Sequence, residues 1–246
     1  MIEFRNLHKA FGDFQVLRGV DLVVQEGETL ALLGPSGTGK SVLIKHAIGL
    51  LEPDQGDVIV DGTSIANASA TELKAVRRKL GYVFQNAALF DSLTVAENLF
   101  LAQEDENSMK LITSCTAEAE ALLRKVNLDA SVLGKLPSEL SGGMRKRVGV
   151  ARAIASNPRY LLWDEPTTGL DPVNADNIDE LILGLARELG VTSIVVTHDL
   201  DTAFDVADRI AILFEGKIIA NQLPDDILEN KDPFVQRFVR RMRVDS

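Results

Sequence analysis

The sequence of 246 residues has the composition of an ordinary globular protein, with 46% hydrophobic and 25% charged residues, which is enough apolar material for a sizeable core. Its formal net charge of −10 argues against broad, non-specific binding to nucleic acid, so we expect no nucleic-acid partner. The single cysteine, Cys115, excludes an intrachain disulfide and is typical of a reducing compartment.

Short apolar or alternating runs predict strands in the first quarter of the chain, at residues 1–7, 16–24, 29–33 and 56–62. The N-terminus lacks a charged region followed by an apolar one, so it does not resemble a signal peptide. No apolar run reaches the roughly 18 residues that a membrane helix needs, and we expect a cytosolic or peripheral chain.

The middle of the chain, about residues 86–157, is rich in Ala, Leu, Glu and Lys and predicts helices without a convincing strand. Residues 160–164 and 192–199 are short apolar runs that end in polar residues, which is typical of central parallel strands. Residues 177–189 predict a helix that stops near Gly190, and residues 210–220 predict a hairpin. The pattern indicates an α/β core interrupted by a helical insert.

The segment "GPSGTGKS" follows a predicted buried strand and precedes a predicted helix, and it matches the phosphate-loop pattern G-x-x-x-x-G-K-[ST] in full. Glycines let the backbone curl so that several N–H groups face one anion, and the helix N-terminus adds partial positive charge. We expect the lysine to contact the terminal phosphates and the last serine to bind Mg²⁺. The predicted nucleotide-binding residues here are Gly34, Pro35, Ser36, Gly37, Thr38, Gly39, Lys40 and Ser41.

The run "YLLWDEP" ends a predicted strand with two carboxylates. Asp164 would project at the edge of the sheet where ligands of open α/β folds bind, and it is a candidate Mg²⁺ ligand. Glu165, one residue later, could take a proton from a water that attacks the γ-phosphate.

A phosphate-loop kinase and a nucleotide-driven motor both fit the phosphate loop, but a kinase needs an acceptor site and a lid. His198, in "VVTHD", ends a strand beside the site and could donate a hydrogen bond to the γ-phosphate, which favours the motor. A lone histidine in such a position can also be purely structural.

Six motifs lie in one order along the chain: "GPSGTGKS", "YVFQN", "LSGGM", "LLWDEP", "GLD" and "VTHD". In this order, over about residues 2–225, the sequence resembles the ATPase subunits of ATP-binding-cassette (ABC) transporters. The resemblance implies one domain over 1–246, with a RecA-like phosphate-loop NTPase core (1–88 and 155–225) and an N-terminal antiparallel β-subdomain. A helical insert (89–154) and a C-terminal helical tail (226–246) complete the expected organisation.

The resemblance also implies further roles. Phe11 matches the aromatic residue that stacks on adenine, where the family usually has tyrosine, and Gln85 matches a residue that contacts Mg²⁺ and the attacking water. Asp171 matches a loop that crosses between subunits, His198 the γ-phosphate sensor, and Glu165 the residue that serves the water.

The "LSGG" segment supplies the second half of a site. A serine caps a helix well, and the following glycines leave backbone N–H groups free. In the family, this helix end addresses the γ-phosphate bound to the other subunit, which implies roles for Ser141, Gly142 and Gly143. One phosphate loop and one "LSGG" per chain predict a homodimer with two equivalent composite sites for ATP and Mg²⁺.

Met144 stands where the family more often has glutamine. The run "LSGGMRKRV", together with "GKSVLIK" and "DPFVQRF", resembles the subset of ABC ATPases that serves lipid traffic at the bacterial envelope, the Mla-type, organic-solvent-tolerance and Mce-linked systems. The alternatives are a generic importer ATPase with an altered signature, or an ABC protein outside transport. The basic residues Arg145, Lys146 and Arg147 are either a solvated helix face or a source of positive potential near the partner's phosphates.

The resemblance also implies that the insert docks transmembrane permease subunits, through a surface to which Leu89, Phe90 and Leu93 could contribute. Lipid-binding accessory subunits are further candidate partners. We expect the protein at the cytoplasmic face of a bacterial inner membrane. In the tail, Phe234, Phe238 and Met242 recur at near-helical spacing. The tail either packs on its own core or contacts another subunit or anionic lipid.

Overall fold

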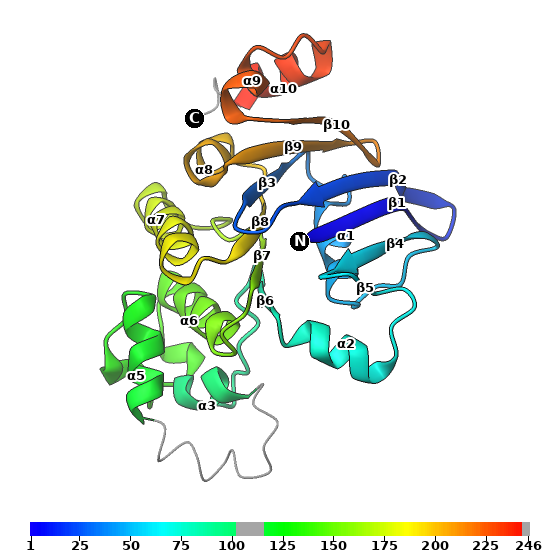
Figure 1. Cartoon of the computed structure of the whole chain (residues 1–246). Helices are drawn as coiled ribbons and strands as arrows, with labels where there is room; N and C mark the ends of the chain where they lie inside the picture. Colours follow the sequence, from blue (N-terminus) through cyan, green and yellow to red (C-terminus); the bar gives the residue numbers. More distant parts are fainter. Residues whose placement is uncertain (102–115, 243–246) are drawn as a thin grey trace.

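The structure, a computed structural model, describes residues 1–101 and 116–242. Near the N-terminus, an antiparallel sheet has the strand order β2-β1-β4-β5 (Figure 1). The first two strands are longer than predicted, because β1 and β2 pair up to a hairpin in which Phe11 lies opposite Phe14. The four strands are β1 (Ile2–Phe11), β2 (Phe14–Val24), β4 (Gln55–Val60) and β5 (Thr63–Ser64).

The central sheet has the order β10-β9-β3-β8-β7-β6. All neighbours pair in parallel except β9 and β10, which form the predicted hairpin with its turn at Glu215 and Gly216. Its strands are β3 (Thr29–Leu33), β6 (Leu80–Val83), β7 (Tyr160–Asp164), β8 (Thr192–Val196), β9 (Arg209–Phe214) and β10 (Lys217–Gln222). The carboxyl ends of the parallel strands therefore meet at one edge, where the polar motif residues follow them.

Helices connect and cover the sheets, and the described part of the insert contains helices and no strand, as predicted. α7 begins five residues before the predicted helix, because Asp171 caps it and a proline suits the first helical position. The helices are α1 (Lys40–Ala47), α2 (Ala70–Arg77), α3 (Val95–Phe100), α5 (Thr116–Lys125), α6 (Gly142–Ile154), α7 (Pro172–Leu189), α8 (Leu200–Val206), α9 (Pro224–Leu228) and α10 (Pro233–Met242). Two 3-10 turns, Ala130–Val132 and Pro137–Glu139, lead into α6.

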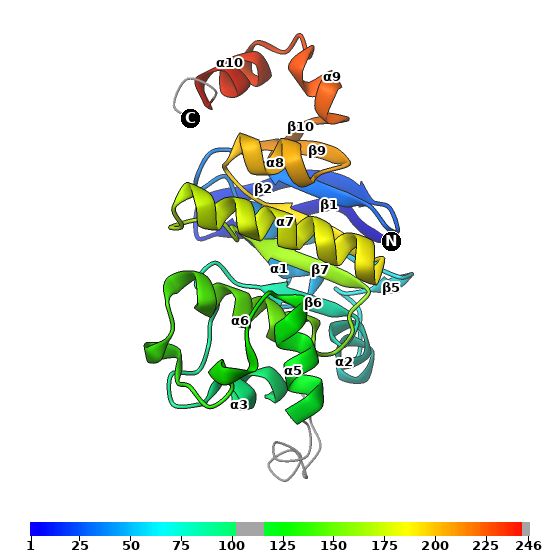
Figure 2. The ribbon, with the colours of Figure 1, turned by 90° about the vertical axis from the view of Figure 1, so that its left-hand side faces the viewer.

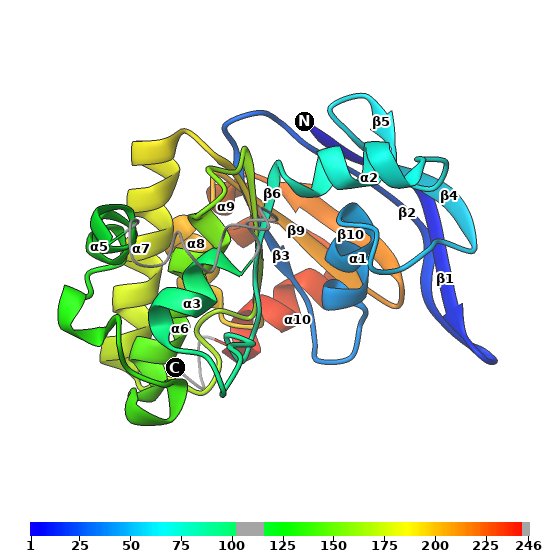
Figure 3. The same cartoon turned by 90° about the horizontal axis from the view of Figure 1, so that it is seen from below.

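The two faces of the central sheet pack against different partners. Alternate residues of β7 point to opposite sides, so that Leu162 joins a core cluster with α1 and the antiparallel sheet, and Leu161 joins one with the insert and α7. Figure 2 and Figure 3 show α7, α6 and α5 on the side of the sheet away from α1. The N-terminus of α1 and the N-terminus of α6 thus belong to different layers of the domain.

The C-terminal helix α10 packs on the protein's own core. Phe234 stacks on Phe214 with ring centroids 3.6 Å apart, and Val235 and Val239 are buried beside α8, β9 and β10. The side chain of Met242 and the residue Cys115, both noted in the sequence, lie outside the described residues. Over the parts of the chain that the structure describes, no helix has the length and apolar character that crossing a membrane requires.

Candidate functional site

The phosphate loop connects the end of β3 to the start of α1, as the sequence predicts. Its glycines are structurally required, because Gly34 and Gly39 have φ of 156° and 100°. A Cβ atom at Gly34 would lie 2.3 Å from the carbonyl oxygen of Leu213, and one at Gly39 would lie 2.6 Å from Val16 Cγ1. Gly39 is the N-cap of α1 and offers no capping side chain, so the first N–H groups of the helix remain available to an anion.

Lys40 is only 4% exposed, and its ammonium group donates to the carbonyl oxygens of Gly34 at 2.7 Å and Pro35 at 3.0 Å. Burial lowers the pKa of Lys40, and the charges of Glu165 and Asp164 oppose that effect. No carboxylate lies within ion-pair distance of this ammonium group in residues 1–101 and 116–242. A desolvated cation beside a loop of this shape fits a phosphate group.

The carboxylate of Asp164 is held by two hydroxyl groups. Ser41 Oγ donates to Asp164 Oδ1 at 2.5 Å, and the hydroxyl of Tyr82 donates to Asp164 Oδ2 at 2.8 Å. Burial and the charge of Asp164 raise the pKa of Tyr82, which therefore stays a neutral donor. A serine oxygen and a carboxylate oxygen side by side fit Mg²⁺, which prefers oxygen ligands and takes few of them from protein. Sequence reasoning missed Tyr82, because its role depends on the pairing of β6 with β7, which only the structure shows.

Glu165 is the centre of a second polar cluster. Its Oε2 atom accepts hydrogen bonds from Thr168 Oγ1 at 3.0 Å and Gln85 Nε2 at 3.3 Å, and His198 Nδ1 lies 3.5 Å away. Among the described residues, His198 Nδ1 has no hydrogen-bond partner. Glu165 itself has φ of 50°, an uncommon conformation for a residue other than glycine. The structure thus brings together Gln85, Glu165 and His198, which follow the neighbouring strands β6, β7 and β8.

The first residues of α6 and α7 form a third group. Ser141 caps α6 as predicted, because its Oγ accepts from the N–H of Met144 at 3.2 Å. Asp171 caps α7 by accepting from the N–H of Asn174 at 3.1 Å. The two helix starts are neighbours, since a Cβ atom on Gly143 would lie 3.3 Å from Asn174 Oδ1.

Phe11 stands apart from these groups, at the end of β1. Its ring is 50% exposed, and Lys9 Nζ lies 5.6 Å from the ring centroid. Within the described ranges, Phe11, Ser141 and Asp171 make no hydrogen bond to Glu165 or Asp164.

Comparison with known proteins agrees with this architecture. The family model described as "ABC transporter" matches residues 17–168. The chain is 40% identical over 252 residues to the methionine import ATP-binding protein MetN of Caulobacter vibrioides, covering all of this chain and 74% of that protein. It is 36% identical over 250 residues to the probable ribonucleotide transport ATP-binding protein mkl of Mycobacterium tuberculosis, covering 99% of this chain and 67% of that protein.

The solved structure of the ATP-binding cassette MJ0796, a dimer in a post-hydrolysis state bound to ADP and phosphate, superposes with a TM-score of 0.80 at 33% identity. That comparison covers 91% of this chain and 99% of the other. The predicted fold, a phosphate-loop core with an antiparallel subdomain and an inserted helical subdomain, is confirmed. The chain belongs to the ABC transporter family and is an ATP-binding, ATP-hydrolysing domain of that family.

Proposed function

We propose that the chain hydrolyses ATP with Glu165 as the residue that receives a proton from the attacking water. The observation that carries this proposal is the cluster around Glu165 Oε2, with Gln85 Nε2 at 3.3 Å and His198 Nδ1 at 3.5 Å. Gln85 orients the water, and His198, whose Nδ1 is free of hydrogen bonds in the described structure, senses the γ-phosphate.

In this proposal, the phosphate loop and the exposed ring of Phe11 hold the nucleotide. Lys40 contacts the terminal phosphates, and Phe11 stacks on adenine. Ser41 and Asp164, with Gln85, would hold Mg²⁺, which would supply charge neutralisation at the phosphates. The fit rests on the two oxygen ligands found side by side.

We further propose a homodimer in which Ser141, Gly142, Gly143 and Asp171 of one subunit complete the nucleotide site of the other. Three observations support it. The start of α6 lies in a different layer from α1, the starts of α6 and α7 are exposed neighbours, and the related cassette MJ0796 was solved as a dimer. ATP would join the subunits, and hydrolysis would release them.

Glu165→Gln tests the catalytic assignment. It should leave ATP binding intact, suppress phosphate release by at least about 100-fold, and trap an ATP-bound dimer in gel filtration, because the side chain keeps its shape and loses its basicity. Glu180→Gln, an exposed glutamate on α7, is the matched control and should hydrolyse ATP at the wild-type rate. Undiminished turnover in the Glu165 variant would remove it from the role.

Ser141→Arg tests the composite site. The exposed capping serine becomes a long cation at the proposed interface, so dimer closure should fail while each monomer still binds a fluorescent ATP analogue. Closure with wild-type affinity in a Glu165→Gln background would contradict the two-half-site arrangement.

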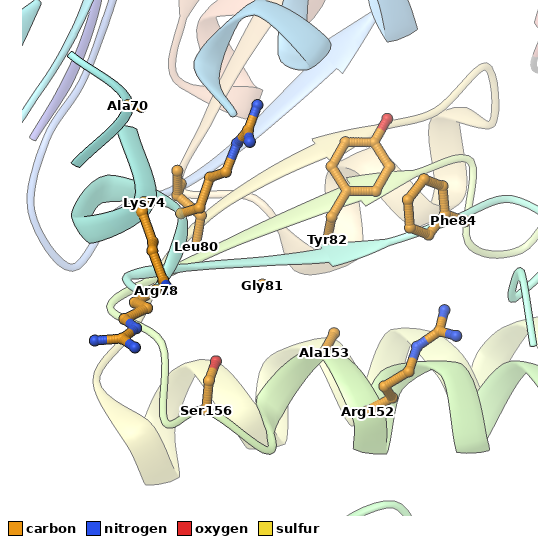
Figure 4. Close-up of a pocket in the computed structure, with 11 residues that line it drawn as sticks. Ala70, Lys74, Arg78, Leu80, Gly81, Tyr82, Phe84, Arg152, Ala153 and Ser156 are labelled. Carbon is orange, nitrogen blue, oxygen red and sulfur yellow. The ribbon is translucent and has the colours of Figure 1, made fainter. Parts of the chain in front are cut away.

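We propose that the chain divides into a core (1–88 and 155–225), a helical insert (89–154) and a C-terminal tail (226–246). In this proposal, the insert docks permease subunits of a membrane transporter. A cavity of about 570 Å³ lies between α2, β6 and α6, the last helix of the insert. In Figure 4, Lys74 and Arg78 stand at one end of it, and Phe84 and Arg152 stand at the other. Beyond the cavity, Phe90 is 53% exposed and could meet a partner, whereas Leu89 packs on the core of the insert.

For the cargo we propose phospholipid or another envelope lipid, with the protein at the cytoplasmic face of a bacterial inner membrane. The proposal rests on the "LSGGMRKRV", "GKSVLIK" and "DPFVQRF" segments. A second candidate, an importer of a small solute, is favoured by the relatives named for methionine import and for choline transport.

Purification from native membranes, followed by mass spectrometry of co-purifying proteins and lipids, separates these candidates. Enriched phospholipid, with or without a lipid-binding accessory subunit, supports the first. A co-purifying solute-binding protein without lipid enrichment supports the second.

A further inference from the structure

The basic residues of α6 bond to the protein's own backbone, although Arg145 remains exposed. All four donate hydrogen bonds to backbone carbonyl oxygens, and three of them reach other segments of the chain. The bonds are Arg145 to Leu140 at 2.6 Å, Lys146 to Pro166 at 2.6 Å and Thr168 at 2.5 Å, Arg147 to Asn127 at 3.2 Å, and Arg152 to Ala88 at 2.8 Å and Ala87 at 2.7 Å. Through Lys146 and Arg152, helix α6 therefore binds the two loops that follow Glu165 and Gln85.

Lys146 holds the first loop. Its ammonium group lies between the carbonyl oxygens of Pro166 and Thr168, in the segment that joins Glu165 to Asp171. Burial lowers the pKa of Lys146, and the charge of Glu165 opposes that effect. A partly desolvated cation with two short bonds to one loop fixes the position of that loop firmly.

The same loop aims the carboxylate of Glu165. Thr168 accepts a bond from Lys146 through its carbonyl oxygen, and its hydroxyl donates to Glu165 Oε2 at 3.0 Å. Because Glu165 has a φ of 50°, its backbone conformation needs support from its surroundings. Lys146 thus reaches the carboxylate through one intervening residue.

Arg152 holds the second loop in a similar way. Ala87 and Ala88, directly after Gln85 and Asn86, have φ of 59° and 49°, which alanine seldom adopts. The guanidinium group of Arg152 donates to both carbonyl oxygens, and burial lowers its pKa. Gly149 lets α6 come close, since a Cβ atom there would lie 3.1 Å from Ala87.

We propose that Lys146 and Arg152 are positioning residues that tie helix α6 to the two loops carrying Glu165 and Gln85. This inference rests on the proposed function of those two residues and of Ser141. Since Ser141 at the start of α6 faces the partner's nucleotide in that proposal, any displacement of α6 on dimer closure moves Glu165 and Gln85 in the subunit's own site. Closure on one nucleotide is thereby coupled to the water-activating geometry at the other.

Lys146→Met, which keeps chain length and removes the charge, tests the first tie. We expect kcat for ATP to fall by about tenfold or more, because a loop shift well under 1 Å is enough to misplace a general base, while KM stays within about twofold. Lys146→Arg should restore most of kcat, since a guanidinium group can also donate to two carbonyl oxygens. Arg147→Met, on the same helix with a bond to Asn127, is the matched control and should keep kcat.

A merely structural role for Lys146 makes a different prediction. Thermal unfolding would then shift, kcat measured well below the melting temperature would stay within about twofold of wild type, and Lys146→Arg would show no selective rescue of kcat. That outcome would overturn the proposal. Arg152→Gln provides a second variant with the same expected loss of kcat at unchanged KM, should Lys146→Met fold poorly.

The parallel assay of Glu165→Gln keeps this test separate from the proposed function. If Glu165→Gln abolishes turnover and Lys146→Met does not change it, the catalytic assignment stands and the tie is refuted. If Glu165→Gln hydrolyses ATP normally, the proposed function fails first.

Discussion

Asp179, a buried carboxyl group between α7 and α8, should make the stability of the domain depend on pH. Its side chain is 8% exposed, Oδ2 accepts from Thr202 Oγ1 at 2.9 Å, and Oδ1 has no partner among the described residues. Burial raises the pKa of Asp179 to about 7, and the charges of Asp199, Asp205 and Asp176 add to this effect.

The expected magnitude follows from the pKa in the two states. A rise from the ordinary value of 3.8 to about 7 corresponds to roughly 4 kcal/mol in the free energy of unfolding. Because the folded-state pKa lies above the unfolded one, this stabilisation is full below about pH 4 and is lost as the pH rises through about 7. About 2 kcal/mol of this stabilisation is lost between pH 5.5 and pH 8.

Asp179→Asn removes the titration and keeps an amide oxygen that can accept from Thr202. Relative to wild type, the variant should therefore gain about 2 kcal/mol of stability between pH 5.5 and pH 8. Urea unfolding at several pH values in that range measures the difference and stays clear of the isoelectric point near 4.9. Exposed Glu180 also lies on α7 and is not among the charges named as raising the pKa of Asp179, so Glu180→Gln is the matched control, which should change stability by less than about 0.5 kcal/mol at every pH.

A constant difference between wild type and Asp179→Asn across the pH range would refute the reasoning. It would mean that Asp179 keeps one charge state throughout, either because solvent reaches Oδ1 or because a cation neutralises it. A destabilised variant at every pH would instead assign the main role to the geometry of the bond from Thr202.

Three further changes have definite expectations. Gly81→Ala places a Cβ atom 2.4 Å from the carbonyl oxygen of Ala153, so β6 and α6 must separate, which should cost about 1–3 kcal/mol and lower the melting temperature by several degrees in a calorimeter. Phe11→Ala should weaken ATP binding about tenfold in a fluorescence titration by removing the stacking surface, whereas Phe11→Tyr should bind like wild type. Tyr82→Phe removes a donor to a buried carboxylate, and urea unfolding without nucleotide should show a loss of about 2 kcal/mol.

Much of the fold could be predicted because the central strands are continuous apolar runs. The bounds of β3 and β7 agree with the prediction, since both strands are buried on both faces. β6 was missed, because its four residues lack a pattern and gain strand structure only by pairing with β7. α2 was missed as well, although Ser69 and Glu72 form a capping box that was visible in the sequence.

The residues of the candidate site likewise include some that the sequence predicted and some that it did not. Glu165 and His198 could be proposed together because each follows a predicted strand, and parallel strands end at one edge of a sheet. Gln85 was proposed only from the family resemblance, because the strand before it, β6, was not predicted. Tyr82 and Thr168, which hold the two carboxylates, could not be proposed, because their hydroxyl groups act only through the tertiary position of their backbone. Sequence motifs thus indicated the proposed reactive groups and not the residues that hold those groups in position.

The basic run of α6 shows why charge patterns alone mislead at such a site. A lysine or arginine in a helix predicts solvent or an opposite charge, because those are its commonest partners. Here the partners are carbonyl oxygens of loops in left-handed or turn conformations, which expose their acceptors outside any helix or strand. A loop that must be strained to place Glu165 or Gln85 also leaves carbonyl oxygens unpaired, and cations on the adjacent helix satisfy them. Arg145 and Arg147 bond to carbonyl oxygens outside these loops. The charges of Lys146 and Arg152 are therefore a consequence of how the loops after Glu165 and Gln85 are built.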